Sequence, residues 1–224
     1  MASGATDHLA RLHEVTTAEP RHVIRAHGDV VHAVALASRR GIVATGADDG
    51  SLALTRLRDG RLLRLVQRRG APIWSAAFSS DEQVLFTAAQ DGVLRGYRVD
   101  DGRIVLHRRI TSSPLISLAV SARHLAVGAG DGRVHVTGAG GTGDVRTLDG
   151  HGQTIYGLAF DPSGRQLASG SADWSVRLWN VERGSLTAVL DDFDEAVFSL
   201  AFDPAGRRLA VACGGGTIHV LEAR

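Results

Sequence analysis

The sequence predicts an all-β repeat protein, and three observations carry that prediction. A turn aspartate recurs with spacings of 42, 42, 40 and 42 residues, at Asp7, Asp49, Asp91, Asp131 and Asp173, and Gly215 stands at the next place. Short apolar runs are separated by Asp-Gly or Asp-Pro-x-Gly, in which glycine supplies the positive φ of hairpin turns. No stretch carries a sustained helical period. A period of about 40 residues built from short strands predicts a β-propeller.

Each repeat is expected to contain three strands of this kind, and the last two repeats show them most clearly. The fourth repeat should form strands at 155–160, 166–170 and 175–180, and the fifth at 197–202, 208–212 and 217–221. The first strand of each earlier repeat is expected at 31–36, 73–78 and 115–120. Turn residues bound every one of these apolar runs, which is the usual strand and hairpin pattern.

The sequence starts within a repeat, because residues 3–15 match residues 169–181 position for position. A third strand is therefore expected at 8–14 and an outer strand at 21–26. This predicts five complete four-stranded blades plus an N-terminal partial repeat. The boundaries are 1–26 for the partial repeat and its closing strand, then 27–66, 67–108, 109–148, 149–190 and 191–224 for the blades.

An incomplete repeat leaves a sheet edge open, and an open edge invites pairing. Three arrangements are consistent with the sequence. In the first, the strand at 21–26 joins the fifth blade and leaves the strand at 8–14 unpaired. In the second, two or more chains complete each other, which would be self-association through the incomplete blade. In the third, the sequence belongs to a longer chain with further repeats upstream.

The composition of the chain limits the classes of protein to which it can belong. With 224 residues, 44% hydrophobic and 22% charged, the chain can bury a sizeable core, and disorder is not expected. A net charge of +1 argues against general binding to nucleic acid or to anionic membranes. The apolar stretches are too short to span a bilayer. The N-terminus lacks a basic region followed by an apolar one, so no secretory signal is expected.

The basic residues and the cysteine suggest where the protein works. All 25 basic residues are arginine, which resembles usage in GC-rich bacterial genomes and excludes any lysine chemistry. The single Cys213 lies in an apolar strand and is expected to be a small core residue. Together with the absence of a recognisable secretory signal, the lone cysteine favours a reducing cytoplasm.

The fourth repeat resembles the WD40 family. The matching residues are Gly150-His151, Ser169, Asp173 and Trp179-Asn180, at the Gly-His, Ser/Thr, Asp and Trp-Asp places, with asparagine where aspartate is usual. The resemblance covers nearly the whole chain. It implies that each repeat supplies an outer strand d and then strands a, b and c, with strand a lining a central channel.

The resemblance also implies a structural hydrogen-bond network. Asp173 should accept from His151, and the Ser169 hydroxyl should join His151 to the Trp179 indole. A Ser-His-Asp catalytic triad is rejected, because Ser169 lies in a strand without a nucleophile-elbow motif. Other repeats keep less of the network: His27, Thr45 and Asp49 in the first, Thr87 and Asp91 with Arg69 at the histidine place in the second, and Asp131 alone in the third.

Metal and cofactor chemistry is not expected. His22, His27 and His32 are evenly spaced, but no cysteine or carboxylate pattern joins them into a ligand set. The glycine-rich run at 138–143 is not followed by lysine or by a helix, so it is expected to be a linker rather than a phosphate loop. No catalytic residue, metal or cofactor is therefore assigned.

The second residues of the five strands a together form the candidate partner surface. In WD40 proteins this place tends to line the channel mouth and to touch partners. Here it holds His32, Trp74, Ile116, Tyr156 and Phe198, with Asp48 nearby. Large aromatic residues of this kind dominate binding hot spots. The alternative is that these side chains pack between neighbouring blades.

The sequence therefore predicts a non-enzymatic scaffold that binds a protein or peptide. The predicted surface is the end of the sheets formed by the d–a loops and b–c turns, called here the d–a/b–c face. By analogy with similar bacterial domains, the chain is expected to be the sensor or docking part of a larger signalling protein. Two alternatives stay open. One is a propeller enzyme with its site at the channel mouth, and the other is a fragment without independent function.

Overall fold

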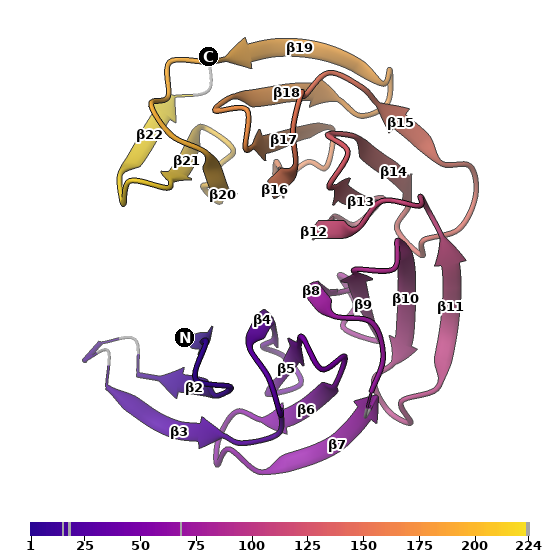
Figure 1. The fold of residues 1–224 in the computed structure, drawn as a ribbon, viewed down its shortest axis with the longest axis vertical. Coiled ribbons are helices and arrows are strands. Elements are labelled where there is room, and N and C mark those ends of the chain that lie inside the picture. Colours follow the sequence, from indigo (N-terminus) through magenta and orange to yellow (C-terminus); the bar gives the residue numbers. More distant parts are fainter. Residues whose placement is uncertain (15, 18, 68, 223–224) are drawn as a thin grey trace. The chain divides into compact units, whose positions relative to one another are not determined.

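The computed structural model describes residues 1–14, 16–17, 19–67 and 69–222. It divides into two units, Met1–Arg109 and Ile110–Arg224, and each is described by itself. The described residues form strands in six antiparallel sheets, and none of them is helical (Figure 1). They accordingly include no helix long and apolar enough to cross a membrane. The predicted all-β fold is confirmed.

The first unit contains three sheets whose strands follow one another in chain order. The first sheet consists of β1 (Ala2–Gly4), β2 (Ala10–His13) and β3 (Pro20–Ile24). The second consists of β4 (Val31–Ala37), β5 (Ile42–Ala47), β6 (Leu52–Arg56) and β7 (Leu62–Gln67). The third consists of β8 (Ile73–Phe78), β9 (Val84–Ala89), β10 (Val93–Arg98) and β11 (Ile104–Arg109).

The second unit repeats this arrangement with three further sheets. The first consists of β12 (Leu115–Val120), β13 (His124–Ala129), β14 (Val134–Gly138) and β15 (Arg146–Leu148). The second consists of β16 (Ile155–Phe160), β17 (Gln166–Ser171), β18 (Val176–Asn180) and β19 (Ser185–Leu190). The third consists of β20 (Val197–Phe202), β21 (Arg208–Cys213) and β22 (Ile218–Glu222).

The four strands of a complete sheet are strands a, b and c of one repeat, followed by strand d of the next. The strands expected at 73–78, 115–120, 155–160 and 197–202 are confirmed at those residues, and the other expected strands lie within two residues of their predicted bounds. The turn aspartates lie between strands b and c. Short apolar runs and Asp-Gly turns are local signals, so the sequence could place these strands without knowledge of distant contacts.

The last of the five expected blades differs from the others in its described strands. Among the described residues, the sheet β20–β22 has three strands, and β22 is its edge. In the other sheets of this unit, the segment after strand c turns back and pairs with it as strand d. No described residue pairs with β22 in that way.

The strand expected at 8–14 is not left unpaired, as the first of the three arrangements would require. β2 pairs with β3 in a register that places Ala10 opposite Ile24 and Arg11 opposite Val23. β2 is not an unpaired remnant, because Ala10 and Leu12 are buried together with Ile24 against the sheet β4–β7. Burial of these apolar side chains is the reason for this pairing.

Neighbouring sheets within each unit pack closely through a glycine. Ile73 at the start of β8 lies against Gly46 of β5, where an added Cβ would approach Ile73 Cγ2 to 2.7 Å. In the second unit, Ile155 at the start of β16 lies against Gly128 of β13, where an added Cβ would approach Ile155 Cγ2 to 2.5 Å. Buried clusters surround both contacts and draw residues from the two sheets concerned. The core of each unit therefore lies between sheets.

Candidate functional site

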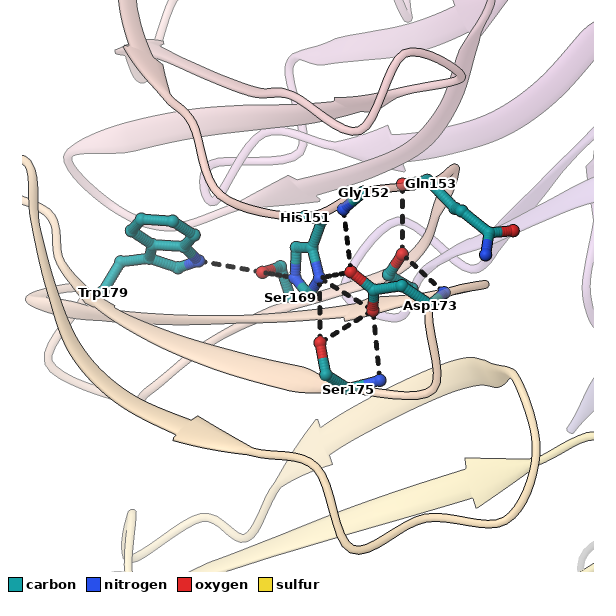
Figure 2. Close-up of polar contacts among 8 residues, drawn as sticks. His151, Gly152, Gln153, Ser169, Asp173, Ser175 and Trp179 are labelled. Atoms are coloured by element: carbon teal, nitrogen blue, oxygen red, sulfur yellow. Dashed lines mark hydrogen bonds and ion pairs between the residues drawn. The ribbon is translucent and has the colours of Figure 1, made fainter.

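A buried polar network joins the loop before β16 to strands β17 and β18 (Figure 2). The Trp179 indole N–H donates to Ser169 Oγ (2.8 Å), and the Ser169 hydroxyl donates to His151 Nε2 (2.8 Å). The other ring nitrogen of His151, Nδ1, donates to Asp173 Oδ2 (2.9 Å). Ser169, His151 and Trp179 are buried. The Ser169 hydroxyl thus satisfies buried polar groups and is not presented to solvent as a nucleophile.

Asp173 holds the loop and the turn together. Its carboxylate accepts from the Gly152 N–H (2.9 Å) and from the Ser175 hydroxyl (2.7 Å). Burial by itself raises the pKa of the Asp173 carboxyl, but hydrogen bonds from Ser175, Gly152 and His151 outweigh it and lower that pKa to about 2. Burial also lowers the pKa of His151, although Asp173 opposes this shift. The pair at neutral pH is therefore a neutral imidazole and a carboxylate.

The first repeat contains a related network with a different connection. His27 Nε2 lies 2.7 Å from Thr45 Oγ1, whereas Nδ1 lies 2.6 Å from Ser51 Oγ. Ser51 in turn donates to Asp49, which also accepts from the Gly28 N–H (2.7 Å). The direct His–Asp hydrogen bond of the fourth repeat is replaced by a serine relay, because the Ser51 hydroxyl stands between the ring and the carboxylate.

The second repeat forms an arginine pair, but not with the arginine that the sequence suggested. Asp91 receives a two-point ion pair from Arg95 of β10, not from Arg69. Thr87 is buried, and its hydroxyl has no hydrogen-bond partner among the described residues. In the third repeat, Asp131 accepts from the Arg133 N–H and guanidinium instead of from a histidine. Among the described residues, the network is therefore complete only in the fourth repeat.

Removing the carboxylate of Asp173 should destabilise the protein more than removing that of Asp131. We expect Asp173→Ala to lower the free energy of unfolding by about 2–4 kcal/mol, because the buried His151 loses its partner. Asp131→Ala removes contacts with the half-exposed Arg133 and should cost under about 1 kcal/mol. Urea denaturation at pH 7 measures both values. Equal losses would contradict the structural role assigned to Asp173.

The lowered pKa of Asp173 gives a pH dependence as well. Because the folded-state pKa of about 2 lies below the ordinary value of 3.8, the carboxylate stabilises the fold above pH 3.8, and this contribution is lost as the pH falls towards 2. The stability difference between wild type and Asp173→Asn should therefore shrink by about 2 kcal/mol between about pH 6 and pH 2. Urea titrations across this range test it, and a constant difference would argue against the assignment.

The five candidate partner residues share one backbone feature. Each is the extra residue where the register between strands a and b shifts, which is a β-bulge. In β4, Val31 pairs with Ala47 and Ala33 with Gly46, so His32 has no opposite residue. The residue before the bulge is buried, and the bulged residue is half-buried or exposed. The bulged residues are His32, Trp74, Ile116, Tyr156 and Phe198.

In the first unit, the bulged residues of β4 and β8 contact each other and have polar partners. The ring centroids of His32 and Trp74 lie 4.5 Å apart. His32 Nε2 lies 3.0 Å from Asp48 Oδ2, and the Trp74 indole N–H donates to Gln90 Oε1 (2.7 Å). Asp48 and Gln90 occupy the same place, directly after strand b. The sequence analysis named Asp48 but missed Gln90.

In the second unit, the aromatic pair lacks such partners. Tyr156 of β16 and Phe198 of β20 stack with centroids 4.8 Å apart and planes at 27°. The places that correspond to Asp48 and Gln90 hold Ala172 and Gly214. Among the described residues, the Tyr156 hydroxyl has no hydrogen-bond partner, and Phe198 is 51% exposed. The remaining candidate of this unit, Ile116 of β12, is half-buried.

The sequence analysis also passed over an exposed tryptophan. Trp174 follows Asp173 in the turn between β17 and β18, is 54% exposed and has a φ of 67°. Gly50 and Gly132 hold this place in other turns, with φ of 71° and 82°. Side chains with a Cβ rarely adopt this region, and the usual cost is about 1–3 kcal/mol. A tryptophan where other repeats have glycine was the signal that could have identified it.

The evenly spaced histidines do not converge on one point. His22 Nε2 contacts the carbonyl of Arg58 (3.2 Å), whereas His27 and His32 contact side chains of their own repeat. In the part of the chain that the structure describes, no group of three or more His, Cys, Asp or Glu side chains could hold a metal ion.

Comparison with known proteins agrees with this architecture. The family model described as "WD domain, G-beta repeat" matches residues 143–180 and 184–221, and the one described as "Anaphase-promoting complex subunit 4 WD40 domain" matches residues 34–123. No curated protein matches the chain. Antiparallel sheets with a turn aspartate between strands b and c define a repeat protein of the β-propeller class. With these matches, the chain belongs to the WD40-repeat family.

Proposed function

We propose that this chain is a non-enzymatic scaffold that binds a protein or peptide through the d–a/b–c face of its sheets. WD40 repeats indicate a protein-interaction domain in general. The observation that carries the finer proposal is the bulge in each strand a, which directs a large side chain away from the core. The residues proposed to contact the partner are His32, Asp48, Trp74, Ile116, Tyr156 and Phe198.

The proposal assigns no catalytic residue, metal or cofactor. An enzyme would need converging acids, bases or metal ligands at the d–a/b–c face, and the His32–Asp48 pair alone does not make a reaction centre. We further propose a cytoplasmic location and a docking role within a bacterial signalling protein, both on the sequence features described above. The division into the six segments 1–26, 27–66, 67–108, 109–148, 149–190 and 191–224 is part of the same proposal.

Selection of linear peptides from a random display library on the full chain tests the partner surface. We expect each selected peptide to lose affinity by about 30-fold when an aromatic residue in the unit that it contacts is truncated, the usual effect of removing an aromatic anchor. The variants are Trp74→Ala in the first unit and Tyr156→Ala and Phe198→Ala in the second. Leu186→Ala is the control, because Leu186 is 42% exposed on the outer strand β19. Circular dichroism checks that each variant folds. Wild-type affinity in all three folded variants would rule out this surface.

A second candidate function is self-association through β22, and the burial of strand c favours it. The strand c residue three positions after the turn aspartate is at most 1% exposed in the other sheets, at Ala10, Leu52, Leu94, Val134 and Val176. Ile218 holds this place in β22 and is 71% exposed, and Val220 is 62% exposed. An uncovered apolar edge strand is a template for pairing with another chain. We propose that β22 of one copy pairs with β22 of a second copy.

Light scattering over a concentration series tests this pairing. We expect the mass of the wild type to rise with concentration and Val220→Lys to abolish the rise, because a charge on an edge strand opposes pairing. Val189→Lys is the matched control, since Val189 is 42% exposed on β19 in a complete sheet. A wild type that stays monomeric throughout, or equal effects of both substitutions, would exclude β22 as the interface.

A further inference from the structure

We propose that the aromatic pair of the second unit receives the cationic side chain of an arginine- or lysine-containing peptide. This inference rests on the proposed function and names the chemistry of the partner. It begins with the difference between the two aromatic pairs. The rings of the first unit have polar side-chain partners, whereas the corresponding places beside Tyr156 and Phe198 hold Ala172 and Gly214. The second pair is therefore open to a ligand.

A carboxylate lies close to the exposed ring of Phe198. A Cβ added to Gly214 would lie 3.1 Å from Phe198 Cε2 and 3.3 Å from Glu195 Oε2, so the ring and the carboxylate come close together above this glycine and leave little room for a side chain there. The Glu195 side chain also approaches Gly215, where an added Cβ would lie 3.5 Å from its Cγ. Phe198 and Glu195 are both exposed, so a cation that approaches the ring from solvent would meet the carboxylate beside it.

The loop that carries Glu195 is acidic and firmly anchored. Asp191, Asp192, Asp194 and Glu195 are all exposed, and none of them forms an ion pair with a described residue. Phe193 between them is buried in the core of the unit, and its ring lies edge-on to His219 with centroids 5.3 Å apart. The loop therefore presents unpaired negative charges to solvent, and Phe193 anchors its middle in the core.

A cationic side chain is the occupant that suits both features. Aromatic faces attract cations through the quadrupole of the ring, and a carboxylate adds a charge-assisted hydrogen bond. A phosphate-bearing partner would be repelled by the acidic loop. An apolar partner would desolvate the Glu195 carboxylate without pairing it. A guanidinium can stack flat on a ring while it donates to the carboxylate, so arginine should be preferred over lysine.

The peptides selected on the full chain provide the probe. We expect arginine or lysine to recur at one position of those that depend on Phe198. In a selected arginine peptide, replacing that residue by the neutral isostere citrulline should weaken binding by about threefold to 30-fold. Glu195→Gln should cause a similar loss with the arginine peptide and little further loss with the citrulline peptide. Glu182→Gln, an exposed carboxylate in the turn between β18 and β19, should change neither affinity.

The outcomes separate the two proposals. Peptides that depend on Phe198 but carry no recurring cation would overturn the cation inference and leave the proposed function intact. Equal affinity of wild type and Glu195→Gln for the arginine peptide would do the same. If no selected peptide responds to Tyr156→Ala or Phe198→Ala, binding at this surface fails, and the cation inference fails with it.

Discussion

The packing of a branched apolar residue against a glycine of the preceding sheet is the contact on which each unit depends. Ile73 against Gly46 and Ile155 against Gly128 leave no room for a Cβ, so the sheets approach closely. This approach fixes the first residue of strand a in the core. The β-bulge then supplies one extra residue, and that residue must point away from the core. The candidate partner surface is thus a consequence of how the core packs.

The polar network fixes the loops around that surface. Asp173 binds the Gly152 N–H, and the Ala172 N–H donates to the carbonyl of Thr154 (2.9 Å), so loop and turn are joined at two points shortly before Tyr156. The backbone that carries the Tyr156 side chain is therefore already ordered before a partner arrives. A surface of this kind loses little conformational entropy when a partner binds. If Tyr156 binds a partner as proposed, the hydrogen bonds of the fourth repeat contribute by preorganising the backbone that carries its side chain.

The local sequence pattern was enough to predict the strands and the turn aspartates. It did not predict which strands pair when they are far apart in the sequence. The residues at 20–24 do not identify the strand that pairs with them, and their pairing with β2 accompanies the burial of Ile24 beside Ala10 and Leu12. The sequence also did not predict which side chains meet. Arg95 rather than Arg69 pairs with Asp91, and the Ser51 hydroxyl lies between His27 and Asp49. Trp174 could have been singled out by aligning the repeats, because it stands where other turns have glycine and this comparison requires no knowledge of contacts.

The two aromatic pairs show how one backbone plan can carry different surfaces. Trp74 and Tyr156 occupy equivalent bulges, so the backbone does not distinguish them. The difference lies in the residue after strand b, which is Gln90 beside Trp74 and Ala172 beside Tyr156. A partner that covers Trp74 must accommodate a side chain already hydrogen-bonded to the ring, whereas one that covers Tyr156 meets an unpaired hydroxyl. At the equivalent place beside Phe198, Gly214 has no Cβ, and an added Cβ would lie 3.1 Å from Phe198 Cε2 and 3.3 Å from Glu195 Oε2, so a glycine there lets the ring and the carboxylate lie close together.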